Sequence, residues 1–117
     1  MLTLAYVGDA VYELWVRTYL LDQGLVRADD LHKAAVRCVQ AKGQAKLMKI
    51  LLPELEEEER AIFYRGRNAK SSYPRGGDVL DYRHATGFEA LIGYLHLSGR
   101  QERLATLLEK TRKAVDN

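Results

Sequence analysis

Two carboxylates, Asp9 and Glu89, lie within segments of the chain that are otherwise strongly apolar. The segment around Glu89, residues 88–97, reads FEALIGYLHL. A helix that is apolar nearly all round is buried, and a lone carboxylate on it must be paired, protonated or bound to a metal. If the two helices pack together, the carboxylates can share a hard cation such as Mg²⁺, which takes oxygen ligands and keeps several waters. The alternatives are an ion pair with an Arg or a hydrogen bond from a hydroxyl for Glu89, and a helix cap for Asp9.

A stretch rich in glycine and cations precedes the second of these segments. Gly66, Gly76 and Gly77 predict a loop of about a dozen residues, in the length range where loops are usually functional or mobile. Its cations, with Arg83 beyond it, are Arg65, Arg67, Lys70 and Arg75. A phosphodiester needs its charge neutralised and a water brought in line, which two carboxylates and Mg²⁺ supply. The pattern therefore favours metal-assisted hydrolysis of a phosphate substrate. The alternative for the loop is a solvated linker whose cations only keep it soluble.

Other residue types offer weaker chemistry. His32, His84 and His96 are too scattered along the chain for a zinc site. Cys38, beside Val39, is typical of a small core residue. Neither set competes with the two carboxylates.

The elements that must position these carboxylates are helices. Apolar residues recur at steps of three and four, and no stretch alternates with a period of two. The expected helices are Leu4 to Leu21, one from Asp29 or Asp30 that continues or bends near Gly43 to reach Leu52, one from Pro53 to about Arg65-Gly66, Tyr82 to Leu97, and Gln101 to Ala114. The sequence therefore predicts an all-α domain of five or six helices.

The composition is that of an ordinary globular domain. The chain has 117 residues, 47% hydrophobic and 29% charged, so we expect one domain over residues 1–117. A single cysteine excludes a disulfide framework, and no apolar run approaches a membrane span, so we expect an intracellular, cytoplasmic location and no membrane partner. The net charge of +2 is too small to indicate a nucleic-acid partner by itself. The acidic run Glu56 to Glu59 is best interpreted as the start of a helix, where acids favour the positive end of the dipole.

Two segments resemble the ribonuclease III family. Residues 4–14, LAYVGDAVYEL, are similar to its signature segment, and residues 86–93, TGFEALIG, to its second acidic segment. Tyr6, residues 65–71 (RGRNAKS) and residues 82–86 (YRHAT) are closest to Mini-III, the bacterial branch without a double-stranded-RNA-binding domain. The resemblance covers about residues 4–100.

The resemblance implies a helical endonuclease domain of five to seven helices that cleaves double-stranded RNA as a homodimer. It implies dependence on Mg²⁺, with Mn²⁺ as a substitute, 5′-phosphate and 3′-hydroxyl ends, and a precursor of large-subunit ribosomal RNA as the substrate. Carried over by position, Asp9 and Glu89 match two catalytic, metal-binding carboxylates of the family. We expect Arg65, Arg67, Asn68, Lys70 and Arg75 to contact RNA phosphates, because a chain of this length leaves no room for a separate RNA-binding module.

The sequence departs from the general family at two acidic positions, which fall on Ala5 and Thr86. A four-carboxylate site is therefore absent, and we expect RNA phosphate oxygens and waters to complete the metal coordination. Glu13 or Asp81 could substitute for a missing acid, but nothing in the sequence places either of them at the site. The departure also motivates a second hypothesis, a non-catalytic RNA-binding or ribosome-associated relative. A third, an interaction module whose apolar helices serve only dimerisation, leaves the acids unexplained. By analogy the first helix lines the dimer seam, with Tyr6 or Trp15 exposed.

Overall fold

The computed structural model describes residues 1–70 and 77–112. Six α-helices and one 3₁₀ helix follow one another: α1 (Leu2–Asp22), α2 (Ala28–Val39), α3 (Ala41–Leu51), η1 (Leu52–Glu54), α4 (Glu57–Arg67), α5 (Val79–Leu97) and α6 (Gln101–Lys110). The described residues contain no strand, which confirms the all-α prediction. No helix among them is both long and apolar enough to cross a membrane.

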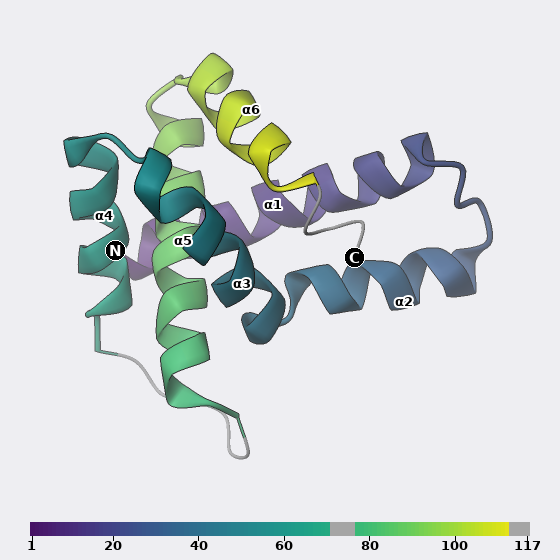
Figure 1. Cartoon of the computed structure of the whole chain (residues 1–117), viewed down its shortest axis with the longest axis horizontal. Helices are drawn as coiled ribbons and strands as arrows, with labels where there is room; N and C mark the ends of the chain where they lie inside the picture. Colours follow the sequence, from purple (N-terminus) through teal and green to yellow (C-terminus); the bar gives the residue numbers. More distant parts are fainter. Residues whose placement is uncertain (71–76, 113–117) are drawn as a thin grey trace.

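Helix α5 forms the centre of the domain (Figure 1). It contacts α1, α3, α4 and α6, and its inward residues from Ala85 to Leu95 are buried. Helix α1 runs across α5, and α2 packs back along α1 (Figure 1). The core joins residues from most of these helices, with Tyr12, Phe63, Phe88, Met48 and Leu51 among its largest buried side chains. Burial of nearly the whole circumference of α5 explains its nearly continuous apolar sequence.

The helix predicted from Asp29 or Asp30 to Leu52 is two helices. The break lies at Gln40, whose extended backbone (ψ 152°) ends α2 and begins α3, three residues before Gly43. Gly43 allows the close packing that follows: a Cβ there would lie 2.5 Å from the Arg37 carbonyl oxygen. Any larger residue at position 43 would push the start of α3 away from the end of α2.

Helix α4 begins at Glu57, so the prediction of a helix start at Pro53 was wrong. Pro53 lies in the 3₁₀ helix, and the backbone at Leu55 is extended. The acidic run does start a helix, as expected: Glu56 and Glu59 form a capping box, in which the Glu56 backbone N–H donates to Glu59 Oε1 at 2.9 Å.

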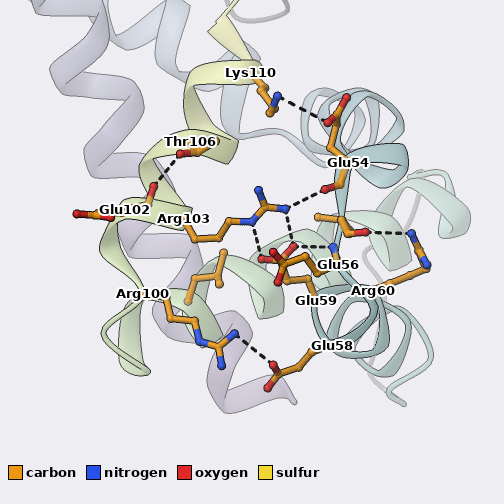
Figure 2. A network of polar contacts seen from close by, with 12 residues as sticks. Glu54, Glu56, Glu58, Glu59, Arg60, Arg100, Glu102, Arg103, Thr106 and Lys110 are labelled. Carbon is orange, nitrogen blue, oxygen red and sulfur yellow. Dashed lines mark hydrogen bonds and ion pairs between the residues drawn. The ribbon is translucent and has the colours of Figure 1, made fainter.

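A network of ion pairs fastens α4 to α6 (Figure 2). Arg103 donates to both carboxylate oxygens of Glu59, at 2.8 Å each. Arg100 pairs with Glu58 at 3.2 Å on the exposed edge of the same network. The acidic run thus has two structural functions, one within its own helix and one towards α6.

The segment between α4 and α5 is about as long as the predicted loop, but it begins and ends at other residues than predicted. Helix α4 continues through Gly66 to Arg67, and α5 begins at Val79, three residues before the predicted Tyr82. Asp78 caps α5 by accepting hydrogen bonds from the backbone N–H groups of Leu80 and Asp81. The last helix ends at Lys110, while the predicted end, Ala114, lies outside the described residues.

Candidate active site

Two glycines set the distance between α1 and α5. A Cβ built on Gly8 would lie 1.7 Å from the Glu89 carbonyl oxygen, and one on Gly93 would lie 2.0 Å from the Leu4 carbonyl oxygen. The two helices therefore touch backbone to backbone where they cross. Because Asp9 follows Gly8 and Glu89 is one turn before Gly93, the crossing brings one carboxylate from each helix to the same place.

The carboxyl groups of Asp9 and Glu89 are hydrogen-bonded to each other. Asp9 is exposed in the middle of α1, whereas Glu89 is half-buried. Burial, followed by the hydrogen bond to Asp9 and the charge of Asp9, raises the pKa of Glu89 to about 8. A side-chain hydrogen bond from Gln44 acts in the opposite direction. No Lys or Arg of the described residues forms an ion pair with Glu89, so the alternative of an Arg pair was wrong. Asp9 lies within α1, whose N-cap is Met1, so the alternative of a helix cap was also wrong.

No third acid completes this pair. Within residues 1–70 and 77–112, no three His, Cys, Asp or Glu side chains gather closely enough to hold a metal. Glu13 pairs instead with Arg17 at 2.9 Å. At the two positions where the general family has acids, Ala5 is buried and Thr86 donates its hydroxyl to the Tyr82 carbonyl oxygen.

The chemistry of this donor set fits a hard divalent cation. Carboxylate oxygens are the ligands that Mg²⁺ prefers, and one or two from the protein are typical where substrate phosphate supplies others. Two carboxylates in hydrogen-bond contact repel when both are ionised, so the pair must hold either a proton or a cation. Asp9 and Glu89 are therefore the residues that would hold such an ion.

The residues expected to contact RNA lie at the end of α4 and just beyond it. Arg65 and Lys70 are exposed. The Arg67 guanidinium lies over the Tyr64 ring, 5.7 Å from its centroid, and donates to Asn68 Oδ1 at 3.4 Å. Arg65 and Arg67 thus belong to a helix and not to the predicted loop, while Arg75 lies outside the described residues.

Gly66 fixes this end of α4 against α5. A Cβ at Gly66 would lie 2.8 Å from Ala90 Cβ and 3.0 Å from Gly87 Cα, and both of those residues flank Glu89 within α5. The end of α4, with the predicted RNA-contacting residues, therefore packs against the same turns of α5 that carry Glu89.

Of the two aromatic residues expected to be exposed on α1, only Tyr6 is, with 82% of its surface accessible. Trp15 is half-buried and stacks on Tyr19, with ring centroids 5.4 Å apart. Cys38 packs partly buried against the core, as predicted.

Gln44 is the residue near the pair that sequence reasoning missed. Its side chain is 2% exposed and hydrogen-bonds Glu89. The signal was present in the sequence, because Gln44 shares a helical stripe with Leu47, Met48 and Leu51, where a polar side chain is unexpected.

Comparison with known proteins connects this geometry to a family. Residues 2–100 match the ribonuclease III domain family. This matched range contains both carboxylates and the two glycines of the α1–α5 crossing. The chain belongs to the ribonuclease III family. As a member of it, the protein is an endoribonuclease.

The relatives are of the Mini-III type. The chain is 52% identical to the Mini-ribonuclease 3 of Desulfitobacterium hafniense, over 97% of this chain and 73% of that protein. It is also 52% identical to the Mini-ribonuclease 3 of Brevibacillus brevis, over 98% of this chain and 87% of that one. A crystal structure of a protein from Fusobacterium nucleatum, 35% identical, superposes with a TM-score of 0.86 and covers 96% of this chain and 90% of that one. These matches confirm the Mini-III resemblance and the ribonuclease III fold.

Proposed function

We propose that this endoribonuclease hydrolyses double-stranded RNA with Mg²⁺ held by Asp9 and Glu89. The observation that carries the proposal is the hydrogen-bonded pair of carboxyl groups at the α1–α5 crossing, which has no cation from the described part of the chain. An ion pair with an Arg or a Lys would have given the two residues a structural explanation. A pair of acids that must share a positive charge is instead suited to an exchangeable cation.

The chemical step is hydrolysis of a phosphodiester. Water adds through its oxygen to phosphorus, the bond to the 3′ oxygen breaks, and a proton passes to that oxygen, leaving 5′-phosphate and 3′-hydroxyl ends. When bound, Mg²⁺ neutralises phosphate charge and lowers the pKa of water; Mn²⁺ would substitute. Asp9 and Glu89 would hold the ion, and the close contact of α1 and α5 at Gly8 and Gly93 positions these two side chains.

RNA binding rests on the cations at the end of α4. Duplex RNA is recognised largely through phosphates and 2′-hydroxyls, which suits Arg65, Arg67 and Lys70 with Asn68 as a hydrogen-bonding neighbour. We extend the proposal to Arg75, the remaining cation of this stretch. A homodimer would match the approximate two-fold symmetry of a duplex, with one site for each strand. Exposure of Tyr6 on α1 supports a partner subunit there, and light scattering at micromolar protein tests it.

The natural substrate we propose is a precursor of large-subunit ribosomal RNA, processed in the cytoplasm. The similarity to Mini-III supports this choice. The alternative function, RNA binding without turnover, is motivated by Ala5 and Thr86, which leave the site with two acids.

The decisive experiment compares the protein with Asp9→Asn on an end-labelled RNA duplex, with Mg²⁺ or with EDTA. We expect cleavage by the parent only, and only with Mg²⁺. The variant should lose about 10³-fold in rate, since a catalytic cation is worth several kcal/mol of transition-state stabilisation.

Glu13→Gln is the matched control, because Glu13 is an acid one turn further along α1 that pairs with Arg17. It should cleave as the parent does. Duplex binding without cleavage by the parent would establish the non-catalytic alternative instead.

A further inference from the structure

Gln44 carries an unusual hydrogen-bonding pattern for a buried side chain. It is 2% exposed and lies in the first turn of α3, beside the carboxylate pair. Its Nε2 donates to the Val39 carbonyl oxygen at 2.9 Å and its side chain also hydrogen-bonds Glu89. Its Oε1 is buried and has no partner among the described residues.

An unsatisfied buried amide oxygen costs roughly 1–3 kcal/mol. An apolar side chain at position 44 would remove that cost, because the rest of the stripe, Leu47, Met48 and Leu51, is apolar and buried. Stability alone therefore does not explain a glutamine here. What the amide adds is an N–H donor directed at Glu89.

The corner that holds Gln44 is built from three helices. Gly43 lets the start of α3 approach the last carbonyl groups of α2, with a Cβ at position 43 only 2.5 Å from the Arg37 oxygen. The buried Tyr12 hydroxyl of α1 donates to the neighbouring Cys38 carbonyl at 3.4 Å. Because Val39 belongs to this corner, the Gln44 amide has a fixed anchor on its other side.

We propose that Gln44 is a positioning residue for the cation site: its amide N–H, anchored on the Val39 carbonyl, holds the Glu89 carboxylate towards Asp9. The inference rests on the proposed function of the pair as a cation site. The acids absent at Ala5 and Thr86 would strengthen cation binding through their charge. Gln44 strengthens it instead by fixing the orientation of Glu89. Partners of metal ligands in this role typically contribute 10–100-fold to metal affinity.

The test measures Mn²⁺ binding by electron paramagnetic resonance, with and without a short RNA duplex, for the full chain and its variants. Gln44→Met keeps length, volume and helix propensity but removes the donor, so the Kd for Mn²⁺ should rise about tenfold or more. Thermal unfolding should stay within a few degrees, because the lost bond to Val39 is offset by removal of the orphaned oxygen. Gln101→Met, the same exchange at an exposed position of α6, should leave the Kd unchanged.

A double-mutant cycle separates positioning from general packing. In a Glu89→Gln background, Gln44→Met should cause no further loss of Mn²⁺ affinity, because the carboxylate it orients is gone. If Gln44→Met does not fold, Gln44→Leu removes the same donor.

The two proposals fail in distinguishable ways. A parent protein whose Mn²⁺ binding is lost in Asp9→Asn but unchanged in folded Gln44→Met overturns the role of Gln44 alone. Equal losses from Gln44→Met with and without Glu89 also overturn it. A parent protein that binds no Mn²⁺ either with or without the RNA duplex, or binds it equally well as Asp9→Asn, overturns the cation site and the inference with it.

Discussion

Glu59 and Glu89 are two glutamates that the fold takes out of water in opposite ways. Glu59 is fully buried at the start of α4, and Arg103 reaches it with two hydrogen bonds of 2.8 Å (Figure 2). The hydrogen bond from Arg103 lowers the pKa of Glu59, despite its burial. Glu89, half-buried on α5, has another acid as its neighbour, and its pKa is raised to about 8.

The difference shows that burial of an acid does not by itself indicate function. Glu59 is neutralised by a cation of the same chain, so its charge is used within the fold. Glu89 and Asp9 have no such cation among the described residues, so their shared charge is available to something that binds. The identity of the neighbour distinguishes the structural acid, Glu59, from Glu89, the acid proposed to be functional.

Removing the cation that pairs with Glu59 should leave Glu59, like Glu89, without a cationic partner from the chain. Arg103→Met leaves a fully buried carboxylate unpaired, and we expect a loss of about 3–5 kcal/mol in the free energy of unfolding near pH 7, measured with urea. The pH dependence should invert. In the parent, the pKa of Glu59 is lowered below its unfolded-state value of 4.5. The ionised, paired Glu59 therefore stabilises the folded state above pH 4.5, and this contribution is lost as the pH falls. The unpaired one should destabilise as the pH rises.

Arg100→Met is the control for that loss. Arg100 pairs with Glu58 at 3.2 Å, but both side chains are exposed, so the expected cost is below about 1 kcal/mol. Equal losses for the two variants would contradict the distinction drawn for Glu59.

Gly8→Ala should break the other half of the comparison by separating Asp9 from Glu89. Its Cβ would collide with the backbone of α5, and overpacking of this kind costs about 1–3 kcal/mol. Cleavage with Mg²⁺ should fall even where the variant is fully folded. Ala10→Leu, on an exposed position of the same helix, should change stability by less than about 0.5 kcal/mol. Full activity in Gly8→Ala would show that the crossing does not position the pair.

Glu89→Gln sharpens the comparison through pH. Because the folded-state pKa of Glu89 lies above the unfolded value of 4.5, its stabilising contribution is complete below pH 4.5 and is lost as the pH rises through about 8. In EDTA, the parent should therefore lose stability between pH 5 and 8, and Glu89→Gln should be the more stable by about 1–2 kcal/mol at pH 8, after allowance for partial exposure.

Mg²⁺ should abolish this fall in the parent, as followed by thermal unfolding. Glu13→Gln should retain the parent's pH dependence. A parent whose stability is flat from pH 5 to 8 in EDTA would argue against the shared proton.

Lys70→Ala should have the smallest effect and tests a cation that the fold leaves uncommitted. Lys70 is exposed and has no ion pair among the described residues. If it contacts an RNA phosphate, the slope of log affinity against log salt should flatten by about one unit. Lys110→Ala is the matched control, because Lys110 pairs with Glu54 at 3.7 Å. An unchanged slope for Lys70→Ala would remove Lys70 from the interface.

Much of the site follows from sequence because a carboxylate on an apolar helix conflicts with its surroundings. That conflict singled out Asp9 and Glu89, and the structure brings them together. The helical periods likewise predicted the all-α fold. The glycines of the crossing could not be predicted in the same way, since Gly8 and Gly93 have no side chain to add to a pattern and act only through a distant backbone.

Helix boundaries were less predictable where local signals competed. Pro53 is typical of a first helical position, but the capping box formed by Glu56 and Glu59 sets the start of α4. Asp78 caps α5 at Val79, and the prediction of a start at Tyr82 missed it. The break at Gln40 has no such signal, because it depends on the packing of α3 against the end of α2.

The close contact of Gly66 with α5 has a consequence for how the enzyme tolerates motion. Since α4 and α1 are both in close contact with the turns of α5 that flank Glu89, a displacement of α5 would carry the end of α4 proposed to bind RNA phosphates together with the carboxylate pair. Under the proposed function, the distance between the bound RNA phosphates and the scissile bond is then set by contacts with one helix, α5. Cleavage position should accordingly be insensitive to flexing elsewhere in the domain.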